Sequence, residues 1–246
     1  MSQESTSHTD NQEAEPQESV WLNLIMNIAI PSLIMMKGSS EEYLGPTWGL
    51  IVALCFPLGY GIYDFFRTSK INWFSVIGII SVLLTGGISL LKLPPEYMAI
   101  KEAAIPGILG MAVLISAFTQ YPLVKVLLFN KKMIQVDKVN RELSSRSNES
   151  AFEKVLLHAS YMLAGSFFLS SVLNYGLAKW ILVSPPGTEA YTAELGKMTA
   201  LSYPIIVIPS MIIMMTALFY LMNRVTKLTG LSLEDMMVEQ ASKKKS

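Results

Sequence analysis

The sequence contains few charged residues, one cysteine and two histidines. Of its 246 residues 15% are charged and 51% are hydrophobic, with a mean hydropathy of +0.41. Soluble domains carry about 25% charged residues, so an ordinary soluble domain is excluded. The single cysteine, Cys55, excludes an intrachain disulfide. Two histidines, His8 and His158, are too few for a metal site built from histidines.

The sequence also lacks the short motifs that carry common chemistries. It has no phosphate-binding glycine loop, no dinucleotide fingerprint, no Cys-x-x-Cys pair and no Ser-His-Asp arrangement. We therefore predict no catalytic residues, no metal, no cofactor and no enzymatic activity. The 19 basic and 19 acidic residues cancel, which excludes a nucleic-acid binder that depends on overall basicity.

In contrast, the sequence is rich in long apolar runs. A helix needs about 20 apolar residues to cross a bilayer core of about 30 Å, and backbone in lipid must be helical. Six runs approach this length, and they comprise residues 20–36, 44–63, 73–91, 103–124, 155–183 and 199–222. We predict an all-α polytopic membrane protein with six transmembrane helices, kinked by internal prolines.

The two ends of the chain are polar. Residues 1–19 hold five acidic residues and no Lys or Arg, so they lack the basic start of a signal peptide. We expect a disordered acidic tail there. In the C-terminal tail, 225–246, Ser232 begins a Ser-x-x-Asp pattern, a variant of the capping box, which predicts a short helix over about 233–241.

The distribution of Lys and Arg predicts the orientation. With six spans both termini lie on one side, which also holds the loops 64–72 and 125–154. Of the 19 basic residues all lie on that side except Lys37, Lys92, Lys101, Lys179 and Lys197. Because basic loops stay in the cytoplasm, we predict that both termini are cytoplasmic.

The same basic residues allow a second interpretation, attraction to anionic lipid headgroups. The candidate headgroup residues are Lys131, Lys132, Lys138, Arg141, Lys243, Lys244 and Lys245. Within 125–154, Val136, Val139 and Leu143 share one helical face, which suits either an interfacial helix or a solvated one.

Polar residues inside or beside the spans are candidate site residues. Lys101, Glu102, Asn174 and Lys179 could form an outward-facing polar vestibule. Alternatively, they are separate charges and amides at helix ends, with the lysines reaching the interface through their long side chains.

The first run offers another polar feature. Asn23, Asn27 and Pro31 are spaced four residues apart, and Pro31 frees the carbonyl of Asn27. This pattern indicates either a notch for a ligand or ion, or amides that bind a neighbouring helix and satisfy the kink.

Small residues also recur at helical spacing. Gly45 and Gly49 form a Gly-x-x-x-Gly pattern that suits close packing of helices. That packing is either internal or the contact of a homodimer.

Four stretches carry a resemblance to a known family. They are GLIVALCFPLGYGIYDFFRTSKIN (49–72), ISVLLTGGISLL (80–91), KEAAIPGILGMAVLISAFTQYPLVKVLL (101–128) and FEKVLLHASYMLAGSFFLSSVLNYGLAKW (152–180). In this order they resemble the intracellular septation protein A family, especially its longer relatives that are described only as membrane proteins or candidate transporters. The chain departs from that family in its acidic N-terminal tail, its longer 130–154 loop and its Lys-rich C-terminal tail.

The resemblance implies a multi-pass protein of the bacterial inner membrane without an established reaction. We expect a non-enzymatic scaffold that supports envelope integrity or division, with membrane lipids and envelope or division proteins as partners. The alternative is a small secondary transporter. A transporter should hold a polar cavity at mid-membrane, whereas a scaffold should be packed solid there.

Overall fold

The computed structural model describes residues 24–68, 73–129 and 134–237. The described residues are helical apart from turns and one isolated β-bridge between Ile134 and Met237. The elements, in chain order, are η1 (Ile25–Ala29), α2 (Ile30–Leu33), η2 (Ile34–Gly38), α3 (Gly45–Thr68), α4 (Trp73–Leu90), α5 (Pro95–Ser116), α6 (Leu123–Leu128), α7 (Val136–Ser145), α8 (Glu149–Ile181), α9 (Glu189–Ser202), η3 (Tyr203–Val207), α10 (Ile208–Thr229) and α11 (Leu233–Met236).

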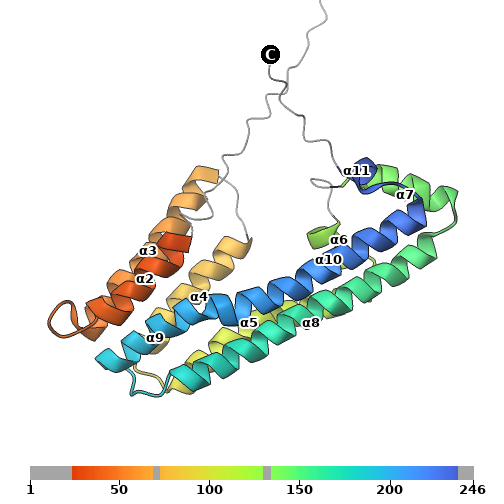
Figure 1. Cartoon of the computed structure of the whole chain (residues 1–246). Helices are drawn as coiled ribbons and strands as arrows, with labels where there is room; N and C mark the ends of the chain where they lie inside the picture. The colour runs from red at the N-terminus through yellow and green to blue at the C-terminus, as the bar shows by residue number, and fades with distance from the viewer. Residues whose placement is uncertain (1–23, 69–72, 130–133, 238–246) are drawn as a thin grey trace, which may run out of the picture.

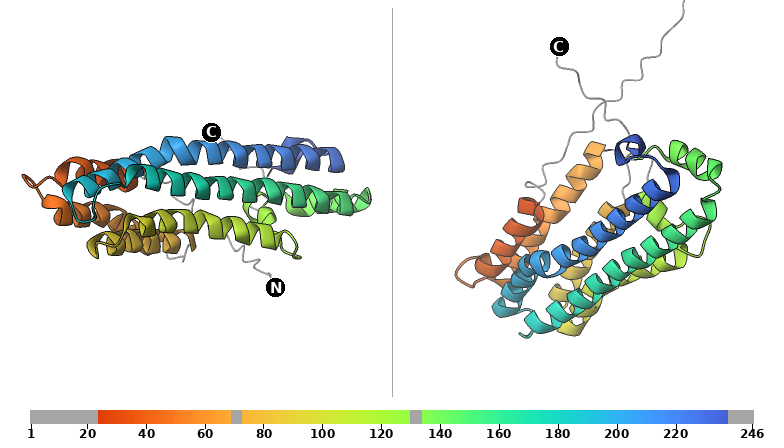
Figure 2. Two further views of the ribbon diagram at one scale, coloured as in Figure 1. Left: turned by 90° about the horizontal axis from the view of Figure 1, so that it is seen from below. Right: turned by 45° about the vertical axis from the view of Figure 1, so that its right-hand side comes forward.

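The long helices form an elongated bundle with α8 at its centre. Figure 2 shows α5 along one side of α8 and α10 along the other. The helices α2, α3, α4 and α9 gather at one end of the bundle, whereas α6, α7 and α11 lie at the other (Figure 1). The turns between consecutive helices thus collect at two opposite ends, as expected for a bundle that crosses a layer.

Four helical segments are long and apolar enough to cross a membrane. They are Gly45–Tyr63, Pro95–Ser116, Glu149–Ile181 and Glu189–Thr229, while Ile25–Gly38 and Val76–Leu90 are shorter apolar helices. Large apolar side chains point outward along them, for example Ile108 (67% exposed), Val172 (68%) and Phe219 (71%). Soluble monomers rarely expose apolar surface on this scale. The helices therefore indicate a membrane-embedded protein.

The bundle contains two buried apolar clusters, one near each end. The first joins Met98 and Ala99 of α5 to Leu177 of α8, Leu195 of α9 and Leu50 of α3. The second, which we call the cap core, joins the end of α5 and the start of α8 to α6, α7, α10 and α11. At 1.5 Å per residue the 33-residue α8 is about 50 Å long, well over a bilayer core of about 30 Å. We infer that the cap core lies largely outside the apolar layer.

The predicted fourth span, 103–124, is misplaced. Helix α5 begins eight residues earlier, at Pro95, and ends at Ser116. Proline suits a first helical turn because its missing N–H is not needed there. At the other end Pro122 disfavours a helical conformation for the residue before it, so the chain turns and restarts as α6.

The prolines of the first and last spans are accommodated by π-helical turns. Pro31 is flanked by η1 and η2, and Pro204 lies in η3. The last span therefore belongs to one helical segment, Glu189–Thr229, instead of a separate 199–222 helix. Residues 20–23 of the first predicted span lie outside the described residues.

The amphipathic helix predicted in the 125–154 loop is confirmed as α7. Its apolar residues Val136, Val139 and Leu143 are buried in the cap core, against α6, α8 and α10. This face is therefore covered by protein, and neither the interfacial nor the solvated interpretation describes it. The fifth helix is also longer at its start than the 155–183 run, because α8 begins at Glu149.

Candidate functional site

Lys101 lies in the apolar helix α5, and its charged side chain is buried against α4. It lies six residues after Pro95 in α5, about 9 Å along the helix, and its side chain is 7% exposed. Its Nζ donates hydrogen bonds to Thr85 Oγ1 of α4 and to Glu102 Oε1, both at 2.8 Å. The Thr85 hydroxyl donates in turn to the carbonyl of Ser81, at 3.0 Å. The ammonium is thus neutralised and bonded within the protein, as a charge in an apolar region must be.

Two further polar groups are buried close to this pair. Ser89, four residues after Thr85 and on the same side of α4, is 3% exposed, and Tyr191 of α9 beside it is 1% exposed. The two hydroxyls are close enough to affect each other, but neither the Ser89 Oγ nor the Tyr191 Oη makes a hydrogen bond of full geometry with a described residue. Buried hydroxyls without partners are rare and are commonly satisfied by an ordered water.

Lys179 forms a separate pair at the surface. Its Nζ lies 3.0 Å from Glu96 Oε1, and both side chains are about half exposed. The sequence prediction does not include Glu96, because the predicted fourth span begins at residue 103. The two adjacent prolines before Glu96, which are typical of a helix start, were the signal for this earlier start.

Asn174 bonds within its own helix. Its Nδ2 donates to the carbonyl of Ser170 at 2.8 Å and lies 3.3 Å from Ser170 Oγ. Of the four predicted vestibule residues the structure therefore brings Lys101 and Glu102 together. Lys179 is paired with Glu96, and Asn174 is bonded to Ser170.

The predicted notch in the first helix is partly described. Asn23 lies outside the described residues, Asn27 is half-buried in η1, and Pro31 is buried in α2. In η1 the hydrogen bonds span five residues instead of four, as in the bond from the Ile30 N–H to the Ile25 carbonyl.

The predicted headgroup residues divide into two groups. Lys131, Lys132, Lys243, Lys244 and Lys245 lie outside the described residues. Arg141 Nε donates to the carbonyl of Asp137 at 3.3 Å. Lys138 Nζ donates to the carbonyl of Asp235 at 3.0 Å and lies 3.4 Å from its Oδ1. Lys138 therefore links α7 to α11.

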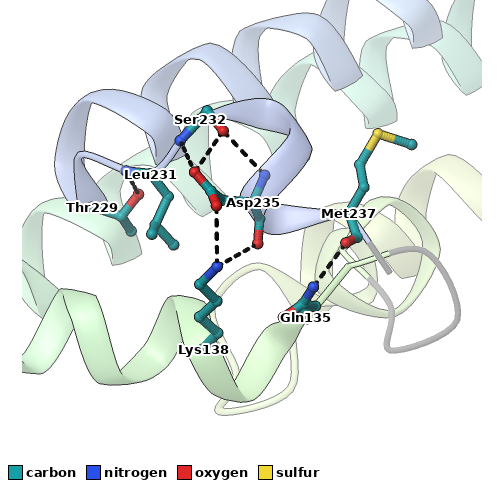
Figure 3. A network of polar contacts seen from close by, with 7 residues as sticks. All are labelled: Gln135, Lys138, Thr229, Leu231, Ser232, Asp235 and Met237. Carbon is teal, nitrogen blue, oxygen red and sulfur yellow. Dashed lines mark hydrogen bonds and ion pairs between the residues drawn. The ribbon is translucent and has the colours of Figure 1, made fainter. Parts of the chain in front are cut away.

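Figure 3 shows how α11 is held at this junction. The predicted capping box is confirmed: the Asp235 N–H donates to Ser232 Oγ at 3.1 Å, and the Ser232 N–H donates to Asp235 Oδ2 at 3.3 Å. The helix ends at Met236, where Met237 turns to extended backbone, so it is shorter than the predicted 233–241. Gln135 Nε2 donates to the Met237 carbonyl at 2.9 Å and continues the contact.

This junction should depend on pH through Asp235. The hydrogen bond from the Ser232 hydroxyl lowers the pKa of the Asp235 carboxyl, with further lowering from the Ser232 N–H and from Lys138. A lowered pKa in the folded state adds stability that is present above the ordinary value of about 4 and is lost as the pH falls through the lowered pKa. In hydrogen exchange corrected for the intrinsic rate, we expect Asp235→Asn to speed exchange of residues 232–237 several-fold at pH 7, with no difference at acid pH. The matched variant Glu234→Gln on the same helix should change nothing, and equal exchange of Asp235→Asn and wild type at pH 7 would contradict the assignment.

A second candidate site is a groove of about 770 Å³ beside the cap core. Its walls are the turn between α5 and α6, the outer side of α7 and the first turns of α8. Charged residues of both signs line it, namely Lys125, Glu149, Glu153 and Lys154. Among the described residues no group of three or more His, Cys, Asp or Glu side chains could hold a metal ion.

Comparisons with protein-family models, with curated proteins and with solved structures find no match for this chain. The resemblance to the intracellular septation protein A family therefore stays a prediction.

Proposed function

We propose that this chain is a multi-pass protein of the bacterial inner membrane that supports envelope integrity or division as a non-enzymatic scaffold. The observation that carries the proposal is the close packing at the middle of the central helix. A methyl group added to Gly110 of α5 would lie 3.1 Å from Phe167 Cβ and 3.2 Å from Phe168 Cε1 of α8. One added to Gly107 would lie 3.2 Å from Ser171 Oγ. Packing this tight between α5 and α8 suits a rigid support better than a substrate path.

Small polar side chains of α8 reinforce this packing. Ser171 Oγ donates to the Ala103 carbonyl of α5, and Ser166 Oγ donates to the Ser210 carbonyl of α10, both at 2.8 Å. Such bonds between helices stabilise membrane bundles by roughly 1 kcal/mol each. They hold α5, α8 and α10 together near the middle of α8 and leave the polar surface to the ends of the bundle.

The proposal includes six spans with both termini in the cytoplasm. The two short apolar helices, Ile25–Gly38 and Val76–Leu90, supply the first and third spans, and the basic loops supply the orientation. In this arrangement the cap core faces the cytoplasm. A folded surface held at the membrane by long helices is what an envelope or division protein could bind.

The second candidate function is secondary transport. The buried Lys101, with the buried hydroxyls of Ser89 and Tyr191 in the same region, favours it, because buried charges in spanning helices often mark substrate or ion paths.

Complementation in cells that lack the chain separates the two functions. We expect such cells to be hypersensitive to detergent and osmotic shock, and we expect wild type and Asn174→Ala to restore resistance equally. Asn174→Ala removes an amide whose hydrogen bonds to other described residues stay within α8, and it should leave the packing intact. Gly110→Leu, which would collide with Phe167, should not restore resistance even when its membrane level matches wild type. A normal envelope in cells without the chain, or full resistance restored by Gly110→Leu at a wild-type membrane level, would contradict the scaffold.

A further inference from the structure

The groove beside the cap core has the layout of a site for an amphiphile. At one end lie Asn140 and Ser144 of α7 and the first residues of α8, all at the polar end of the bundle. At the other end lie Phe118, Leu156 and Leu157, where α8 enters its apolar stretch. The exposed ring of Phe118 is 71% accessible and lies 6.4 Å, centroid to centroid, from the ring of Tyr161. Aromatic side chains of this kind gather at the boundary between headgroups and lipid chains.

The charges in the groove are of both signs and are not paired with each other. Two lysines, Lys125 of α6 and Lys154 of α8, face the same space as two glutamates, Glu149 and Glu153 of α8. None of the four makes an ion pair with another described residue. By contrast, Lys138 and Lys179, which lie outside the groove, do have carboxylate partners.

Unpaired charges of both signs around one cavity match a ligand that also carries both. A phosphate would accept charge-assisted hydrogen bonds from the lysines, and an ammonium would donate them to the glutamates. A volume of about 770 Å³ lies within the range of small-molecule sites. The apolar end, with the exposed Phe118, leaves a place for acyl chains. An anionic headgroup without an ammonium would leave the two glutamates facing a like charge.

We propose that this groove binds the headgroup of a zwitterionic phospholipid, with Lys125 and Lys154 on the phosphate and Glu149 and Glu153 on a primary ammonium. The site is distinct from the basic residues that the sequence suggested for anionic lipid. It holds one lipid of defined charge pattern against the protein. It does not depend on the scaffold proposal.

The test is competition between two lipids on the purified full chain. Native mass spectrometry in detergent, with equal amounts of dioleoyl phosphatidylethanolamine and dioleoyl phosphatidylglycerol, should show one retained lipid, with the zwitterionic lipid preferred about tenfold. Glu149→Gln with Glu153→Gln should abolish that preference, because the anionic lipid no longer meets like charge. Lys125→Gln with Lys154→Gln should weaken retention of both lipids about tenfold.

The control is Lys227→Gln with Glu234→Gln, which removes one charge of each sign outside the groove and should retain the wild-type preference. Thermal melting of each variant should stay close to that of wild type, since none of the four groove side chains makes an ion pair with another described residue. Soluble phosphoethanolamine at the same concentration should not displace the lipid. Displacement by it, no preference in wild type, or equal binding by wild type and both groove variants would overturn the proposal.

Discussion

A Gly196→Ala variant is expected to lose about 3 kcal/mol of the free energy of unfolding. The added methyl group would lie 2.7 Å from the backbone carbonyl oxygen of Ser32 and 2.8 Å from Met35 Cβ, both on the first helical segment. Neither atom can move away by a change of rotamer, because one is backbone and the other is fixed to it. The contact between α9 and the α2–η2 segment must therefore open, and with it part of the apolar cluster around Met35, Leu195 and Met198.

The matched control for this variant is Gly165→Ala in α8. No atom lies within 4 Å of the position that its methyl group would take. Alanine is a better helix former than glycine, so this variant should be neutral or more stable by up to about 1 kcal/mol. Reversible unfolding in mixed detergent micelles, with helicity as the signal, measures both. Equal stability of the two variants would show that α9 does not pack against the first helix as closely as the structure has it.

A similar close approach occurs at the Gly-x-x-x-Gly pattern of Gly45 and Gly49. A methyl group on Gly49 would lie 2.7 Å from Ser39 Cα, so this glycine packs against the end of η2 within the chain. Gly45, the other glycine of the pattern, has φ of +69° and begins α3, with nothing within 4 Å of an added methyl group. The two glycines of the pattern therefore have different roles, a close contact and a turn.

The apolar runs predicted the helical class and the approximate place of most helices, because burial in lipid depends on composition over about 20 residues. They could not predict helix ends. Helix α8 begins at Glu149, six residues before its apolar run, because Phe152 and Val155 pack into the cap core. The first turns of this helix are stabilised by protein contacts that hydropathy does not measure.

The partners of the polar residues were less predictable than the residues themselves. Lys101, Lys138 and Lys179 stand out in the sequence as charges in or beside apolar segments. Lys138 meets Asp235, 97 residues away, and Lys179 meets Glu96, 83 residues away. Such pairs depend on which helices become neighbours. A proline alone likewise does not distinguish a π-helical turn, as at Pro204, from a kink.

A Glu102→Leu variant should lose about 3 kcal/mol of the free energy of unfolding. It leaves the Lys101 ammonium buried, with the hydroxyl of Thr85 as its one remaining partner among the described residues. Lys101→Met should lose less. The Glu102 side chain is 24% exposed, against 7% for Lys101, so its carboxylate can be solvated once the lysine is gone. A larger loss of stability in Glu102→Leu than in Lys101→Met would show that Lys101 is the member of the pair that cannot reach solvent.

The double variant Lys101→Met with Glu102→Leu completes a double-mutant cycle with the two single variants. Replacing both members of a buried ion pair by apolar groups of similar size is often neutral, so the double variant should be more stable than Glu102→Leu alone. This recovery is the measure of their coupling. The comparison pair, Lys179→Met with Glu96→Leu, should show little coupling because both side chains are solvated. If the double variant is as unstable as the sum of its single variants, Lys101 and Glu102 do not form a pair inside the bundle. The buried charge pair that favours a transport function would then be absent.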